Sequence, residues 1–153
     1  MDNEVILREG VVDIKEFKQK MIHDDTEALV TLTEQADQER KGVQIISVEI
    51  ETYGSTTRNS MGKIKDLIQK RFDIGDMVII QGVGSFKPGE TIRGVLVSAS
   101  QKGEALESLA MAMDMFGPHV PIKKRVSTSD GREYWVKRAD EVMNMYGQLA
   151  EGI

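Results

Sequence analysis

The stretch of sequence that decides the fold is DMVIIQGVGSFKPGETIRGVLVSA, residues 76–99. It contains two long apolar runs separated by the turn residues Lys-Pro-Gly-Glu at 87–90. Proline fixes φ at one corner of a turn, and the glycine after it accepts the positive φ that such turns need. Because both runs are long and apolar, we expect two strands at the centre of a sheet rather than at its edge. The stretch therefore predicts a central β-hairpin.

Three further strands are predicted before this hairpin. Residues 5–7 and 28–32 are short apolar segments, and residues 43–53 alternate between two faces, with Ile46 and Ile50 on the apolar one. The polar segment between the second and third of these strands has no period, so we expect it to be a mobile loop.

Helical periodicity marks four segments. Their apolar stripes are Ile14, Phe17 and Met21; Met61, Ile64, Ile68 and Phe72; Leu106, Leu109, Met113 and Phe116; and Val142, Met145 and Leu149. Asp13 can cap the first helix, and Thr56 or Thr57 the second. We expect the third helix to stop before Gly117-Pro118, because this pair cannot continue a helix.

The order of these elements predicts the fold class. Residues 122–127 and 133–136 form a C-terminal hairpin around a Ser-Asp-Gly turn, and the last helix follows it. Helices segregated from a sheet of this kind indicate an α+β fold, a two-layer sandwich of a mixed or antiparallel sheet with helices on one face. The connections are long enough to allow some parallel pairing.

Composition excludes several classes of function. A chain of 153 residues, 40% of them hydrophobic, can bury one core, so we expect a single domain over residues 1–153. A formal net charge of −5 argues against a protein that neutralises nucleic-acid phosphates. The chain has no cysteine, which rules out disulfides, thiolate metal sites and cysteine nucleophiles. We expect no metal site and no cofactor.

The apolar segments are too short for a membrane protein. No apolar run approaches the roughly 18 residues that a membrane span requires, and the N-terminus does not resemble a signal peptide. We therefore expect a soluble, cytoplasmic chain that binds neither membrane nor nucleic acid.

The C-terminal hairpin is locally basic. Residues 120–138 carry six cations and two acids, a balance of +4 in an acidic chain. Successive residues of a strand point to opposite faces, so Lys124 faces away from Lys123 and Arg125. A lysine turned into a cleft can bind phosphate as a point charge or, when desolvated, act as a base or nucleophile. The alternative is a solvated face of an edge strand, where charge guards against aggregation.

The blocks between Ala28 and Val136 resemble the large, catalytic subunit of molybdopterin synthase, the MoaE family. The resemblance includes VIIQGVGSFKPGE, VLVSASQKGEAL, VPIKKRV and GREYWV. The last three are similar to the family patterns Val-x-Val-Ser-Ala-x-His-Arg, Pro-Ile-Trp-Lys-Lys-Glu and Gly-x-x-Trp-Val. The resemblance implies a MoaE-like α/β hammerhead fold.

The same resemblance implies an activity and partners. In this family, sulfur arrives as a thiocarboxylate on the C-terminal Gly-Gly of a small ubiquitin-like subunit, whose tail inserts into a pocket of the large subunit. The substrate is cyclic pyranopterin monophosphate, and the product is the dithiolene of molybdopterin, for a molybdenum or tungsten cofactor. A homodimer is also expected.

The resemblance assigns site residues in this chain. Lys124 falls on the lysine of the Trp-Lys-Lys motif and is the expected catalytic residue. Gln101 and Lys102 stand at the family's His-Arg pair. Together with Lys123 and Arg138, they are expected to bind the substrate.

Several motif positions differ from the family. Lys123 replaces the motif's tryptophan, Val126 its glutamate, Gln81-Gly82 an earlier His-Arg pair, Gly117 a second lysine and Asp37 an arginine. Exchanging arginine for aspartate turns a charge-assisted hydrogen bond to phosphate into repulsion. Two interpretations follow. The chain is either a divergent catalytic subunit whose remaining cations rebuild the anion site, or a non-catalytic MoaE-like binding or regulatory module.

Overall fold

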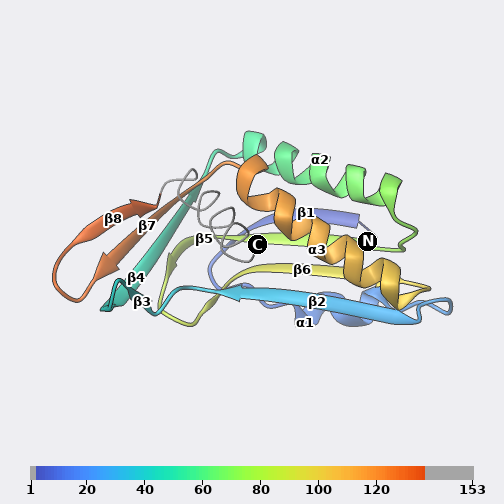
Figure 1. Cartoon of the computed structure of the whole chain (residues 1–153), viewed down its shortest axis with the longest axis horizontal. Coiled ribbons are helices and arrows are strands. Elements are labelled where there is room, and N and C mark those ends of the chain that lie inside the picture. The colour runs from blue at the N-terminus through green and yellow to red at the C-terminus, as the bar shows by residue number, and fades with distance from the viewer. Residues whose placement is uncertain (1–2, 137–153) are drawn as a thin grey trace, which may run out of the picture.

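The computed structural model describes residues 3–136, which form an eight-stranded sheet with helices on both faces (Figure 1). The strand order is β2-β6-β5-β4-β7-β8, with β1 paired to β5 and β3 to β4. The strands are β1 (Asn3–Glu9), β2 (Ala28–Gln35), β3 (Glu39–Arg40), β4 (Val43–Thr52), β5 (Met77–Phe86), β6 (Thr91–Ala99), β7 (Ile122–Thr128) and β8 (Glu133–Val136). The helices are α1 (Lys15–Lys18), the short 3-10 helix η1 (Gln19–Met21), α2 (Ser55–Arg71) and α3 (Lys102–His119).

The central hairpin predicted from residues 76–99 is confirmed. Strands β5 and β6 pair antiparallel, and Gly89 in the turn between them has φ +86°. Strand β5 also pairs in parallel with β1 and, near its end, antiparallel with β4. One long strand therefore connects the two parts of the sheet. The first consists of β1, β2, β5 and β6, and the second is an arm of β3, β4, β7 and β8 that extends to the left in Figure 1.

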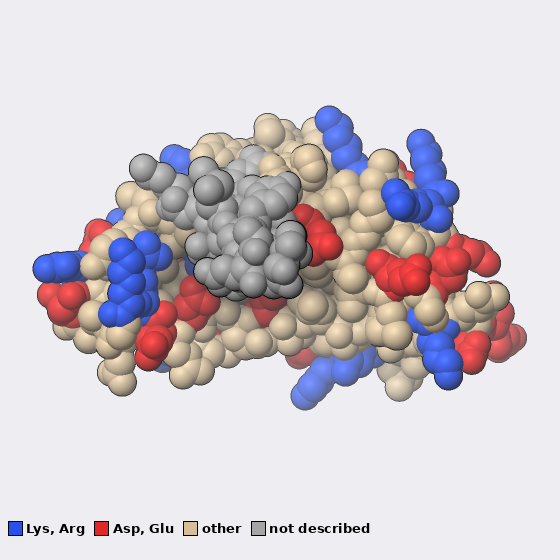
Figure 2. Space-filling view, viewed as in Figure 1, with Lys and Arg blue, Asp and Glu red and all other residues tan. Residues whose placement is uncertain are grey.

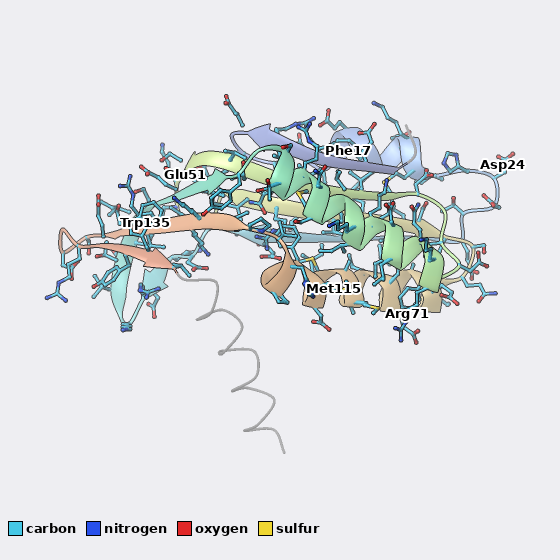
Figure 3. The ribbon with its side chains drawn as sticks, turned by 90° about the horizontal axis from the view of Figure 1, so that it is seen from above. Phe17, Asp24, Glu51, Arg71, Met115 and Trp135 are labelled. Atoms are coloured by element: carbon cyan, nitrogen blue, oxygen red, sulfur yellow. The ribbon has the colours of Figure 1, made fainter. Side chains whose placement is uncertain are left out.

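The α+β fold class is confirmed, with one addition. Helices α2 and α3 cover one face of the sheet, where Met61, Ile68 and Leu109 belong to the largest core cluster. The short α1 and η1 lie on the opposite face, and Phe17 and Met21 bury their side chains against β5 and β6 (Figure 3). The apolar stripe of the first helix is thus buried as predicted. It packs on the second face of the sheet, whereas the sequence predicted helices on one face only.

Helix α2 begins earlier than predicted. Gly54 occupies the cap position, so the expectation of a cap at Thr56 or Thr57 is wrong. Thr57 lies inside the helix and is fully buried, where its hydroxyl accepts a hydrogen bond from the Tyr53 amide and donates to the Pro121 carbonyl at 2.7 Å. This contact fixes the start of β7 against α2.

Helix α3 continues past the predicted end. It runs through Pro118 to His119, so the expectation that it stops before Gly117-Pro118 is wrong. A proline lacks the N–H that would donate to the carbonyl four residues earlier, so the helix loses that bond at Pro118 and ends one residue later. The stripe also differs, because Leu106 is exposed while Ala105, Ala112 and Phe116 are buried.

The prediction for residues 33–53 needs two corrections. Strand β2 extends to Gln35, and residues 39–40 form β3 in place of a mobile loop. In β4 the pairing with β7 shifts between Ile45 and Ser47, so Ile45 is buried and Ile46 is exposed. A bulge of this kind moves a side chain to the opposite face, and the expected core position of Ile46 is wrong.

The C-terminal hairpin is confirmed as β7 and β8, which pair antiparallel and extend the sheet beyond β4. The helix predicted over Val142, Met145 and Leu149 lies outside the described residues, as does Arg138.

Candidate functional site

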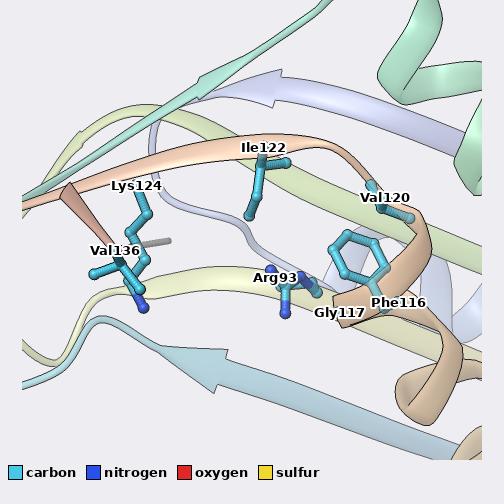
Figure 4. Close-up of a pocket in the computed structure, with 7 residues that line it drawn as sticks. All are labelled: Arg93, Phe116, Gly117, Val120, Ile122, Lys124 and Val136. Atoms are coloured by element: carbon cyan, nitrogen blue, oxygen red, sulfur yellow. The ribbon is translucent and has the colours of Figure 1, made fainter. Parts of the chain in front are cut away.

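A small pocket lies where the C-terminal end of α3 meets β6, β7 and β8 (Figure 4). Its lining residues are Arg93, Phe116, Gly117, Val120, Ile122, Lys124 and Val136. Its volume is about 30 Å³. A water needs about 10–15 Å³ by this measure, so the pocket has room for one small group and not for a fused ring system.

Lys124 comes from β7 and points into this pocket. Its side chain is only 14% exposed, whereas the neighbouring Lys123 is exposed and lies over the ring of Tyr53, 5.6 Å from the centroid. The predicted alternation of the two lysines is therefore confirmed. Lys124 is the one that points inward. It is also the residue that the family resemblance assigned to catalysis.

The Nζ atom of Lys124 lies 3.5 Å from Oδ2 of Asp37, in the segment after β2. The Asp37 side chain is 57% exposed. Because the contact is long and the Asp37 carboxylate lies mostly in water, the pair contributes on the order of 1 kcal/mol or less to stability. Asp37 is thus a weak partner, which a better-placed anion can replace.

Arg93 is a second cation in the pocket, and the sequence analysis did not single it out. It lies on β6, in register with Gln81 of β5 on one side and Glu34 of β2 on the other. Its Nε donates to Oε1 of Gln81 at 2.8 Å, and one terminal nitrogen donates to Oε2 of Glu34 at 2.7 Å. The guanidinium also lies 3.9 Å from the ring centroid of Phe116.

The Gln81 side chain is held in one orientation by its own hydrogen bonds. It is fully buried, and its Nε2 donates to the carbonyl of Gly82 at 2.9 Å and to that of Ile92 at 3.4 Å. Because the amide nitrogen faces two carbonyls, the amide oxygen is the atom that meets Arg93. A residue that replaces a family histidine therefore orients the arginine.

Gly117 lies in the last turn of α3 and lines the same pocket. Among residues 3–136, no atom outside the helix's own backbone and the neighbouring residues lies within 4 Å of a Cβ added at this position. By the resemblance, this is the position of the family's second lysine.

The other predicted site residues are distributed differently. Gln101 and Lys102 are exposed at the start of α3, and a helix of this length separates its two ends by roughly 25 Å at 1.5 Å per residue. Within one chain they do not reach the pocket around Lys124. They lie near another pocket, of about 80 Å³, whose lining includes His23, Asp73 and Ser100.

On the outer face of the arm, Arg125 is paired at the surface. Arg125 hydrogen-bonds to Glu49, approaches Glu133 at 3.6 Å and lies over the ring of Trp135. The hydrogen bond from Arg125 to the Glu49 carboxylate raises the pKa of Arg125, so that it stays charged. The charge of Arg125 is therefore compensated by neighbouring carboxylates.

The face of the molecule in Figure 2 shows basic and acidic side chains mixed along the arm and at the opposite end. Among the described residues visible there, they form no continuous basic surface.

Within residues 3–136, no helix is long and apolar enough to cross a membrane.

The chain is an α+β protein in which a hairpin arm extends from a helix-covered sheet. A pocket with two cations lies where the arm meets the end of α3. The family model described as MoaE protein matches residues 7–116. The chain belongs to the MoaE family. It is 27% identical over 114 residues to the molybdopterin synthase catalytic subunit of Escherichia coli, covering 74% of this chain and 75% of the relative.

Solved structures share the fold, among them the following two. Molybdopterin synthase from Staphylococcus aureus superposes with a TM-score of 0.80 at 20% identity, over 86% of this chain and 95% of the other. A complex of subunits 1 and 2 of the molybdopterin-converting factor from Helicobacter pylori gives a TM-score of 0.72 at 12% identity, over 87% and 90%. The residues matched by the family model end on α3, and Lys124 of the pocket lies beyond them.

Proposed function

We propose that this chain is the catalytic subunit of a molybdopterin synthase. It takes sulfur from a thiocarboxylate at the C-terminal Gly-Gly of a small ubiquitin-like subunit and transfers it to cyclic pyranopterin monophosphate. The observation that carries the proposal is the position of Lys124, which points into the pocket at the end of α3. By the resemblance, Lys124 also stands at the family's motif lysine. Family membership, with relatives named as catalytic subunits, supports it.

The pocket suits the end of an extended tail. A volume of about 30 Å³ admits a terminal carboxylate or thiocarboxylate but not the pterin, so the pterin would bind outside the opening. Glycine has no side chain, and a Gly-Gly end can therefore approach a narrow entrance closely. The two-subunit complex among the structures of the same fold supports a small protein partner.

Lys124 offers the charge that such a tail requires. A thiocarboxylate is an anion, and a lysine ammonium in a mostly buried position attracts it more strongly than one in water. The weak contact with Asp37 leaves Lys124 available to the incoming group. The same lysine would then lie beside the sulfur that has to leave the tail.

The test is product formation. The protein is incubated with a thiocarboxylated small subunit and cyclic pyranopterin monophosphate, and the dithiolene product is measured. We expect product only when the tail carries sulfur, and none from a small subunit that ends in an ordinary carboxylate. A small subunit that binds without any product would contradict the catalytic proposal.

A second candidate is a non-catalytic binding module. Two observations favour it, because Asp37 places a carboxylate beside Lys124 where the family has arginine, and Gly117 supplies no second lysine. Such a module would bind the small subunit through its tail and yield no dithiolene with either form of the tail.

The exposed end of α3 suggests how Gln101 and Lys102 would take part. Because they lie roughly 25 Å from the pocket along the helix, we propose that they serve the pocket of a second copy in a homodimer. A mass equal to one chain in sedimentation at working concentrations would contradict this arrangement.

A further inference from the structure

Arg93 is a charge in a strand that is otherwise built for burial. The segment from Ile92 to Ala99 is mostly buried and packs between β2 and β5. A cation in such a strand is costly unless its hydrogen bonds are satisfied. Three long-range contacts, from Gln81, Glu34 and Phe116, hold this one. The arrangement fixes the guanidinium at the wall of the pocket.

The contacts of Arg93 leave part of its guanidinium for a ligand. Gln81 and Glu34 take one donor each, and a guanidinium carries more N–H groups than these two contacts use. The side chain is 11% exposed and lines the same pocket as Lys124. A planar group held flat against Phe116 presents its remaining edge in one direction, which suits the two oxygens, or the oxygen and sulfur, of a terminal carboxylate or thiocarboxylate.

The two cations of the pocket differ in how firmly they are held. Lys124 has one long contact, to an exposed carboxylate. Arg93 has two shorter hydrogen bonds and an aromatic neighbour. A side chain that is already fixed loses little conformational entropy on binding. More of its interaction energy with the ligand therefore appears as affinity.

We propose that Arg93 is the residue that recognises the terminal carboxylate of the partner's tail. It would replace the family arginine at whose position this chain has Asp37. This inference rests on the proposed function and adds its specificity-determining residue. Arg93 binds the anion, and Lys124, released from Asp37, remains free to act on the sulfur.

The experiment compares two fluorescein-labelled peptides that end in Gly-Gly, one with a free C-terminal carboxylate and one with a C-terminal amide. Fluorescence anisotropy gives the affinity of each for the full chain. We expect the unmutated protein to prefer the carboxylate by about tenfold to a hundredfold, the range of one charge-assisted hydrogen-bonded contact. Equal affinity for the two peptides, or no measurable binding of the carboxylate, would overturn the proposal without any mutation.

Variants then assign the preference to a residue. Arg93→Gln should remove most of the preference, leaving only what Lys124 contributes. Arg93→Lys, which keeps the charge but loses the planar fork, should retain more than Arg93→Gln and less than the unmutated protein. The matched control is Arg8→Gln. Arg8 also pairs with a carboxylate, that of Glu16, and lies over the ring of Phe17, but it is on β1 and does not line the pocket. The control should keep the full preference, and circular dichroism should show that each variant is folded.

The two proposals fail in different ways. A carboxylate preference that depends on Arg93, without dithiolene product, would leave this inference standing and reject turnover. Product formation with a preference unchanged in folded Arg93→Gln and Arg93→Lys would reject this inference and leave the proposed function standing.

Discussion

The two ends of helix α3 carry the two groups of residues that the family resemblance assigned to one site. At the C-terminal end, Lys124 and Arg93 are mostly buried and line a pocket. At the N-terminal end, Gln101 and Lys102 are exposed, and Gln101 makes no side-chain capping bond. Burial is what makes a cation selective for an anion, because water screens an exposed charge. In the function that we propose, the C-terminal end recognises the ligand and the N-terminal end contributes only across a dimer interface.

The strongest test of this comparison is Lys124→Ala. We expect product formation to fall by about a hundredfold or more, the size of effect typical of a lost catalytic group. Lys123→Ala is the matched variant, because the neighbouring lysine points to the other face and lies over Tyr53. Its effect should be much smaller. Similar losses in both variants, measured in the dithiolene assay with folded proteins, would break the distinction between the two faces.

A second test addresses the two ends of α3 directly. Lys102→Ala alone should lower activity if its end serves the pocket of a second copy. Mixing Lys102→Ala with Lys124→Ala chains, unfolded and refolded together, should then restore part of the activity, because mixed dimers contain one site with both lysines. Activity of the mixture no higher than that of either variant alone would place both residues' roles within one chain, against the geometry of α3.

A third test fills the open space at Gly117. Among residues 3–136, no side chain and no backbone outside α3 and the neighbouring residues lies within 4 Å of a Cβ at this position, so Gly117→Lys should fold and add a cation to the pocket. We expect the affinity for the Gly-Gly carboxylate peptide to rise by about threefold to tenfold, as for one partly buried ion pair. Gly62→Lys, within α2 and also without close neighbours among residues 3–136, is the control and should leave that affinity unchanged.

The smallest expected effect comes from Asp37→Asn. Removing the carboxylate that approaches Lys124 at 3.5 Å should raise affinity for the same peptide by up to about fivefold, the upper limit for an exposed ion pair. Titration by anisotropy at low and at high salt measures it. A decrease in affinity would mean that Asp37 positions Lys124 for the ligand rather than competing with it.

Much of the fold follows from local patterns. The hairpin of β5 and β6 was predicted from apolar runs around a Pro-Gly turn, and the direction of Lys124 from the two-residue period of a strand. The end of α3 and the face of Ile46 were not, because each depends on contacts with distant segments. Pro118 is accommodated in the last turn of α3, and a bulge in β4 opposite β7 turns Ile46 outward.

The site shows the same limit. Lys124 could be found from its motif, but Arg93 could not, since its role depends on Glu34 and Phe116, which meet it only in the folded chain. One signal was present in the sequence, a cation within an apolar strand next to Gly94. A charge in a predicted central strand indicates either a partner or a ligand. Here the structure shows partners for part of the guanidinium and a pocket beside it.

The most direct measurement of the central claim is a single incubation of the unmutated protein with its thiocarboxylated partner and cyclic pyranopterin monophosphate. If the pocket around Lys124 is the site of sulfur transfer, dithiolene product forms and the partner's tail is recovered as a carboxylate. If the partner binds and its tail keeps its sulfur, the pocket is a docking site and the catalytic account is wrong.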